Sequence, residues 1–314
     1  MLIILVRRTL GFAVTLLLAS FVIFIVLAVI PGDPARQILG INASAESVAA
    51  LRDRMGLNDP LFVRYGAWLL GLVRGELGTS LTYGVAVSEL IVERAVVSLP
   101  LAAFALFTTA ALALPLGTIA AARRGGVVDR AITTAAQLGI AVPNFWFAIL
   151  LVQLFAVSLR MLPSGGFPGW SDPTGALKSL LLPTIALAVP QAAILTSIVR
   201  SSLVDVLAQP FIRTAHAKGV PYVSVLVRHA LRNGLLPVLT IMGLQFAFLI
   251  SGVIIIEQVF SLPGLGRLVF QAIVQNDLPI VRGVVVCLVA MVIAVNFVID
   301  LLYTLVDPRL RLAS

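Results

Sequence analysis

The sequence predicts an all-α membrane protein with one transmembrane domain over residues 1–314, and three observations carry that prediction. Of its 314 residues, 60% are hydrophobic and 11% are charged, whereas soluble proteins carry about 25% charged residues. Several apolar runs reach the roughly 20 residues that a helix needs to cross a bilayer. The charged residues lie mainly between these runs.

Each apolar run is expected to form a transmembrane helix. The first is too long for the apolar core of a signal peptide, about 7 to 15 residues, so we interpret it as a retained anchor. The predicted spans are residues 9–30, 97–122, 131–159, 179–199, 235–256 and 280–306.

Basic residues indicate the orientation, because those in short loops stay on the cytoplasmic side. With the N-terminus inside, only Asp129, Asp205 and Asp307 oppose the cytoplasmic basic residues. Those basic residues are Arg7, Arg8, Arg123, Arg124, Arg130, Arg200, Arg213, Lys218, Arg228, Arg232, Arg309 and Arg311. We therefore expect both termini in the cytoplasm.

The long segment 31–95 is predicted to be external and helical. Ser44 suits the N-cap of a helix that stops at Gly56, and Pro60 suits the first position of a second helix reaching Val73. We expect a small helical cap on the outer face.

The cytoplasmic loop 200–234 is long and contains helix signals. Pro210 suits a first helical position, while Gly219 and Pro221 end a helix, so a short helix over 210–218 is predicted. Apolar and basic residues then alternate in a pattern that predicts a second amphipathic helix leading back to the membrane. The short helix is either a plug for a groove on a soluble partner or a surface helix whose arginines meet lipid headgroups. Its proposed plug residues are Phe211, Ile212, Thr214, Ala215 and Ala217.

At these residues the chain resembles a known family. Residues 211–219 (FIRTAHAKG), then 226–233 (LVRHALRN) and Pro237, are similar to the coupling loop of binding-protein-dependent ABC importer permeases, most closely of the dipeptide, oligopeptide and nickel branch. Further matching segments are residues 31–34, 75–80, 142–146, 257–266, 300–303 and 307–309. The loop departs from the family pattern at His216, where arginine is common, at Pro221, where a polar residue is common, and in lacking an opening acidic residue.

The resemblance implies a type I ABC importer permease in a prokaryotic inner membrane. It implies three kinds of partner: a second homologous permease, two cytoplasmic ATPase subunits that bind ATP and Mg²⁺, and an external solute-binding protein. The implied cargo is a peptide, with glutathione or a nickel chelate as alternatives. The implied ATPase-coupling residues are Phe211, Ile212, Arg213, Thr214, Ala215, His216, Ala217, Lys218, Gly219, Arg228, His229 and Asn233.

Residue types argue against catalysis on this chain. A P-loop needs Gly-Lys before Ser or Thr, yet Leu177 and Ala217 precede the two lysines, so no cofactor is expected here and ATP hydrolysis is assigned to partners. The two histidines and Cys287 form no metal-ligand pattern. The basic residues flank apolar runs, which suits membrane lipid and not nucleic acid.

Polar residues within the predicted spans are candidates for a solute path, although interhelical hydrogen bonds are the commoner use of such residues. The candidates are Asn144, Gln153, Gln245 and Asn296. Asp300 is the only carboxylate expected inside a span, which argues against the distant alternative of an ion-driven secondary carrier or channel. An intramembrane enzyme would need a nucleophile with its base at membrane depth, yet no histidine lies in any predicted span. A structural scaffold fits the composition and is opposed chiefly by the resemblance.

Overall fold

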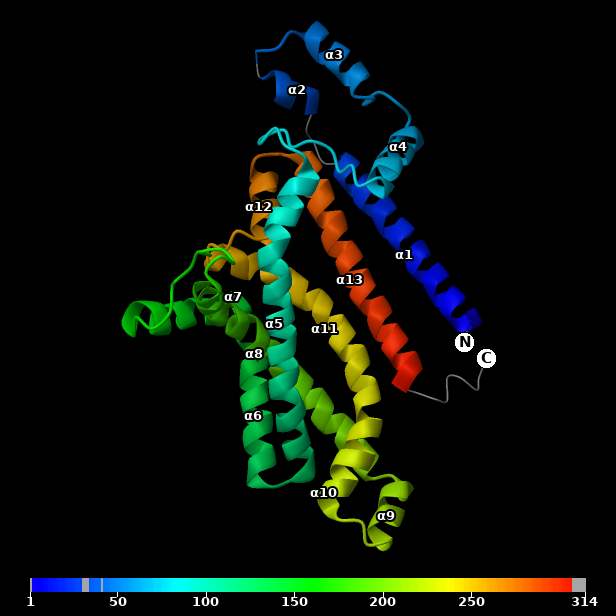
Figure 1. The fold of residues 1–314 in the computed structure, drawn as a ribbon, viewed down its shortest axis with the longest axis vertical. Coiled ribbons are helices and arrows are strands. Elements are labelled where there is room, and N and C mark those ends of the chain that lie inside the picture. Colours follow the sequence, from blue (N-terminus) through cyan, green and yellow to red (C-terminus); the bar gives the residue numbers. More distant parts are fainter. Residues whose placement is uncertain (1, 30–33, 41, 307–314) are drawn as a thin grey trace. The chain divides into compact units, whose positions relative to one another are not determined.

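The computed structural model describes residues 2–29, 34–40 and 42–306, and these residues are mainly helical (Figure 1). Within them the extended backbone pairs at one isolated bridge, between Thr79 and Ala86. The chain divides into two compact units. Unit 1 contains residues 98–263 and the part of the chain from 295 onward, and unit 2 contains residues 2–97 and 264–294.

The helices fall into the units as follows. Unit 2 holds α1 (Leu2–Val29), α2 (Pro34–Leu39), α3 (Ala45–Arg54), α4 (Leu61–Val73) and α12 (Leu265–Val274). Unit 1 holds α6 (Val127–Ala141), α7 (Asn144–Leu151), the π-helix η1 (Val152–Ser158), α8 (Pro173–Leu207), α9 (Pro210–Ala217), α10 (Tyr222–Ser224), the π-helix η2 (Val225–Leu231) and α11 (Arg232–Val259). Two helices, α5 (Val87–Ala122) and α13 (Leu278–Val306), run from unit 2 into unit 1.

Five helices, α1, α5, α8, α11 and α13, are long and apolar enough to cross a membrane, which confirms the predicted fold class. The expected span 131–159 is not one straight helix, because α6 and the segment α7–η1 meet at a bend of 99°. Val142 is extended (φ −86°, ψ 121°), as expected for a residue before proline, and Pro143 has no N–H to continue the helix. Among the residues that the structure describes, a sixth span exists only if this bent pair counts as one.

Helix α8 forms the centre of unit 1 and packs against α6, α7 and α11. Asp172 caps its N-terminus by accepting a hydrogen bond from the Gly175 N–H at 3.0 Å. Helix α5 approaches closely at Gly117, where an added Cβ would lie 2.6 Å from the Cβ of Val199. Glycine is therefore needed at this crossing.

The segment after α1 is helical, as predicted, and its last helix, α4, is largely apolar. Ser44 accepts a hydrogen bond from the Ser47 N–H, and Gly56 ends α3 with φ +64°, which confirms that helix. Pro60 is the N-cap of α4 and not its first residue. Helix α4 packs against α1, and Tyr65 and Ser20 share a hydrogen bond of 2.9 Å between their hydroxyls.

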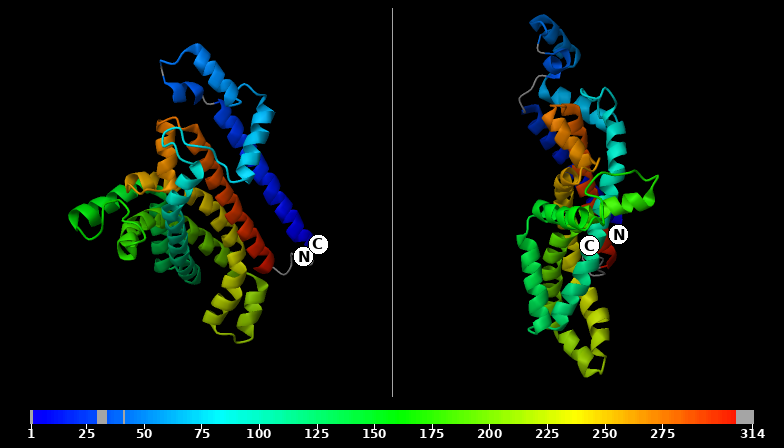
Figure 2. Two further views of the ribbon diagram at one scale, coloured as in Figure 1. Left: turned by 45° about the horizontal axis from the view of Figure 1, so that its top comes forward. Right: turned by 90° about the vertical axis from the view of Figure 1, so that its left-hand side faces the viewer.

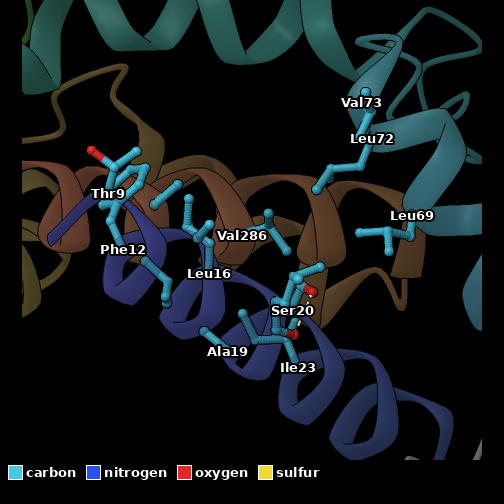
Figure 3. Close-up of a pocket in the computed structure, with 14 residues that line it drawn as sticks. Thr9, Phe12, Leu16, Ala19, Ser20, Ile23, Leu69, Leu72, Val73 and Val286 are labelled. Carbon is cyan, nitrogen blue, oxygen red and sulfur yellow. Dashed lines mark hydrogen bonds between the residues drawn. The ribbon is translucent and has the colours of Figure 1, made fainter. Parts of the chain in front are cut away.

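An apolar cavity of about 530 Å³ lies between α1, α4 and α13 within unit 2 (Figure 3). Phe12, Leu16 and Ile23 of α1 line it together with Leu72 of α4 and Val286 of α13. Burying a polar group costs free energy unless it is hydrogen-bonded. Because the walls are nearly all apolar, we do not assign this cavity to a polar solute.

Candidate functional site: the loop 200–234 and its short helix

The predicted short helix is present as α9, and both of its boundaries follow from the sequence. Gln209 is extended, and Pro210 stands at the first helical position. After Ala217 the chain turns at Gly219, which has φ +78°, and the Val220 N–H donates to the Ala215 carbonyl at 3.2 Å. This is the left-handed ending that glycine permits. Figures 1 and 2 show α9 and α10 together at one end of unit 1.

Two of the five predicted plug residues face the chain's own bundle. Ile212 is 2% exposed and Ala215 is 8% exposed. Both belong to a buried cluster with Leu203 of α8, Val225 of η2 and further residues of α5 and α11. Ile212 and Ala215 therefore anchor α9 to the bundle, and the part of the prediction that offered them to a partner needs this correction.

The opposite face of α9 is exposed and combines one aromatic ring with basic groups. Phe211 retains 43% exposure although its neighbour Ile212 is buried. The other exposed residues of this face and the turn after it are Arg213, Thr214, His216, Ala217, Lys218 and Gly219. An apolar ring among cations suits a groove with an apolar floor and an acidic rim.

The predicted second amphipathic helix is present and continues without a break through α10 and η2 into α11. Arg228 and Asn233 are exposed, while His229 is half-buried. The Asn233 side chain donates to the His229 carbonyl at 2.7 Å. Among the residues that the structure describes, no group of three His, Cys, Asp or Glu side chains is placed to hold a metal ion.

Side chains fix the base of this loop to the bundle. The Ser202 hydroxyl on α8 donates to the Gly234 carbonyl on α11 at 2.8 Å. Arg200 on α8 pairs with Asp129 in the first turn of α6, through Nε at 2.5 Å and a terminal N–H at 2.7 Å. Asp129 is 3% exposed, whereas the Arg200 side chain keeps 29% exposure, so the carboxylate is shielded from water while the guanidinium is only partly buried.

Three of the four predicted path residues lie on α11 or next to it, at separate points along the helix. Gln245 lies on α11, is 3% exposed, and donates from its amide to the Gln191 carbonyl at 3.1 Å. The amides of Asn296 and Asn144 approach two α11 glycines, Gly243 and Gly252. Gln153 is exposed on η1 and lies apart from them.

The sequence interpretation missed buried carboxylates. Glu257 follows directly after the predicted span 235–256, yet it lies inside α11, is fully buried, and accepts a hydrogen bond from the Ser98 hydroxyl at 2.5 Å. In unit 2, Asp277 is also fully buried and accepts from the Ser80 hydroxyl at 2.6 Å and the Thr82 N–H at 2.9 Å. The apolar run before Glu257 signals that the helix continues through it. The buried Glu257 therefore removes the argument against a secondary carrier that rested on Asp300 as the one carboxylate in a span.

The chain aligns with proteins named as permeases over almost its whole length. A protein of Brucella abortus named as a peptide transport system permease is 43% identical over 297 residues, which are 94% of this chain and 95% of that protein. The glutathione transport system permease protein GsiC of Salmonella choleraesuis is 37% identical over 305 residues, 97% of each chain. The fold matches an inward-facing structure of the MetNI methionine ABC transporter with a TM-score of 0.58 at 17% identity, covering 69% of this chain and 96% of that one.

Two family models divide the sequence between them. Residues 1–102 match the one described as "Binding-prot-dependent transport system membrane comp, N-term". Residues 113–312 match the one described as "Binding-protein-dependent transport system inner membrane component". With the relatives above, these matches show that the chain belongs to the family of binding-protein-dependent transport system inner membrane components, the permeases of ABC importers.

Proposed function

We propose that this permease carries peptides across the cytoplasmic membrane by alternating access, driven by ATPase subunits that bind α9. The observation that carries the proposal is the two-sided character of α9. Ile212 and Ala215 fix the helix to the bundle, while Phe211 and the basic residues remain outside. A force applied to the outer face is then transmitted to α8 and α11, which pack in the same buried cluster.

The proposed assembly contains a second permease of similar fold, two cytoplasmic ATPases and an external solute-binding protein. ATP and Mg²⁺ are assigned to the ATPases, because this sequence has no P-loop. The orientation with α9 in the cytoplasm rests on the basic residues of the short loops. Movement between inward-open and outward-open states is a rigid-body transition of packed helices.

Peptides are the proposed cargo because relatives covering nearly the whole chain carry that name, with glutathione as the second candidate and a nickel chelate as a third. The proposed path residues Asn144, Gln153, Gln245 and Asn296 are amides, which both donate and accept hydrogen bonds. A peptide backbone requires both kinds of partner.

The test is uptake by the complete complex in proteoliposomes. Labelled alanyl-alanine, a pentapeptide, glutathione and a nickel–histidine chelate serve as separate probes, each with ATP or with a non-hydrolysable analogue. We expect uptake of a peptide that requires ATP and the binding protein. Uptake that persists without ATP and disappears with an ionophore would favour a secondary carrier and refute the proposal.

A further inference from the structure

Tyr222 joins the end of the coupling loop to a helix 100 residues earlier. Its hydroxyl donates to the carbonyl of Ala122, the last residue of α5, at 3.1 Å. The last carbonyls of a helix have no partner within the helix, so this hydroxyl satisfies one of them. The Tyr222 ring also stacks on His216, the seventh residue of α9, with centroids 6.0 Å apart and planes 16° apart.

Two neighbouring residues, Pro221 and His216, determine the position of this tyrosine. Pro221 is the N-cap of α10 and begins the helix at Tyr222. His216 supplies the flat ring on which Tyr222 stacks. Both residues therefore contact or position Tyr222.

A second tie holds the other side of the same turn. The turn 123–126 connects α5 with α6, and the Asp129–Arg200 pair fixes the start of α6 to α8. The Gly125 N–H also donates to Asp129 at 2.8 Å. The α5–α6 hairpin is thus attached at α5 to the coupling loop and at α6 to α8.

The Tyr222–Ala122 hydrogen bond and the Asp129–Arg200 ion pair connect the α5–α6 hairpin to different parts of unit 1. Helix α9 is continuous in the chain with α8 and with α10, so a push on α9 reaches both of them through the backbone. The α5–α6 hairpin is not adjacent to α9 in the chain. A displacement of α9 therefore reaches the hairpin through side-chain contacts and packing. Tyr222 is 46% exposed, so its hydrogen bond contributes little to overall stability. The bond still holds the Ala122 end of α5 next to the start of α10.

We propose that Tyr222 is a positioning residue that makes the α5–α6 hairpin move together with the coupling helix. This inference rests on the proposed function. When the ATPases displace α9, the stacked pair His216–Tyr222 carries the Ala122 end of α5 along. Without the hydroxyl, α9 still binds the ATPase, but part of its displacement is lost before it reaches the hairpin.

The first test measures transport per ATP in the complete reconstituted complex with Tyr222→Phe. Phenylalanine keeps the ring for stacking on His216 and removes only the hydroxyl. The matched control is Tyr83→Phe in the outer loop of unit 2. We expect ATPase binding and ATP hydrolysis to stay at the wild-type level in both variants. Alanyl-alanine carried per ATP should fall about twofold in Tyr222→Phe alone, the lower end of what one net hydrogen bond gives, because this bond is exposed to solvent. An unchanged ratio would overturn the proposal.

The second test needs no transported solute. Spin labels at Arg124→Cys and Gln209→Cys, in a Cys287→Ser chain, report the distance between the α5–α6 turn and the start of α9. In the complete complex, with and without ATP–vanadate, we expect one narrow distribution for wild-type Tyr222 and an additional population for Tyr222→Phe with nucleotide. Identical distributions for both chains would refute the proposal. If the wild-type complex takes up none of the probes, the proposed function is refuted. The distance measurement still tests the role of Tyr222, because it does not depend on a transported solute.

Discussion

Replacing Phe211 and Ile212 separately by alanine tests whether the two faces of α9 have different partners. An aromatic side chain buries about 150 to 250 Å², and Phe211 retains 43% exposure, so roughly 85 Å² remains for a partner to cover. At about 25 cal/mol per Å² this area corresponds to about 2 kcal/mol, or about thirtyfold in affinity for the ATPase.

Ile212 has almost no surface left to offer a partner, so Ile212→Ala acts on the chain itself. Truncating a buried isoleucine costs about 2 to 5 kcal/mol, and here the loss falls on the packing of α9 against α8 and η2. We expect faster hydrogen exchange across α9 and a lower melting temperature. Phe211→Ala should leave both unchanged.

The assay is a titration of the purified permease with its ATPase subunit in detergent, run beside a thermal melt followed by tryptophan fluorescence. Phe211→Ala should weaken binding about thirtyfold at a constant melting temperature. Wild-type affinity in Phe211→Ala, or a melting temperature lowered as much as in Ile212→Ala, would refute the assignment of the two faces.

Three further predictions test other contacts. Asp129→Asn leaves Arg200 without its shielded partner and should lower the melting temperature, whereas adding Arg200→Gln should restore part of the loss; equal melting of the single and double variants would contradict this. Gly219→Ala places a side chain at φ +78°, costs about 1 kcal/mol and should reduce ATP-driven uptake more than Gly219→Asn does, since asparagine tolerates this conformation; equal uptake would contradict it. The hydrogen bond from the Gly175 N–H lowers the pKa of Asp172, and a hydrogen bond from the Thr174 hydroxyl lowers it further. Its capping contribution is therefore complete above the ordinary aspartate pKa and is lost as the pH falls below it, so acid should lower the melting temperature of the wild type more than that of Asp172→Asn.

The short-range features of the coupling loop could be read from the residues themselves. Pro210 and Gly219 mark the ends of α9 because proline fits a first turn and glycine accepts a positive φ. Ser44 and Gly56 delimit α3 in the same way. Each signal depends on a residue and its immediate neighbours, so no knowledge of the rest of the fold is needed.

Boundaries and bends were less predictable where competing rules met. The run 131–159 is apolar throughout, yet the steric effect of Pro143 on Val142 breaks it. Helix α12 was not predicted, and α4 was expected as part of an external cap although Tyr65 holds it to α1. At Val142 a local steric rule outweighed the apolar pattern, whereas α4 is placed by its contact with α1.

The sequence alone determined that the chain is helical and membrane-embedded, and that a basic loop with a short helix interrupts its spans, because hydrophobic content, charge placement and turn residues act locally. Only the tertiary structure decided which residues of α9 face inward, that Glu257 and Asp277 are buried with hydrogen-bond donors, and that Tyr222 reaches Ala122. Burial and long-range hydrogen bonds depend on segments far apart in the chain, and only the folded arrangement brings those segments together.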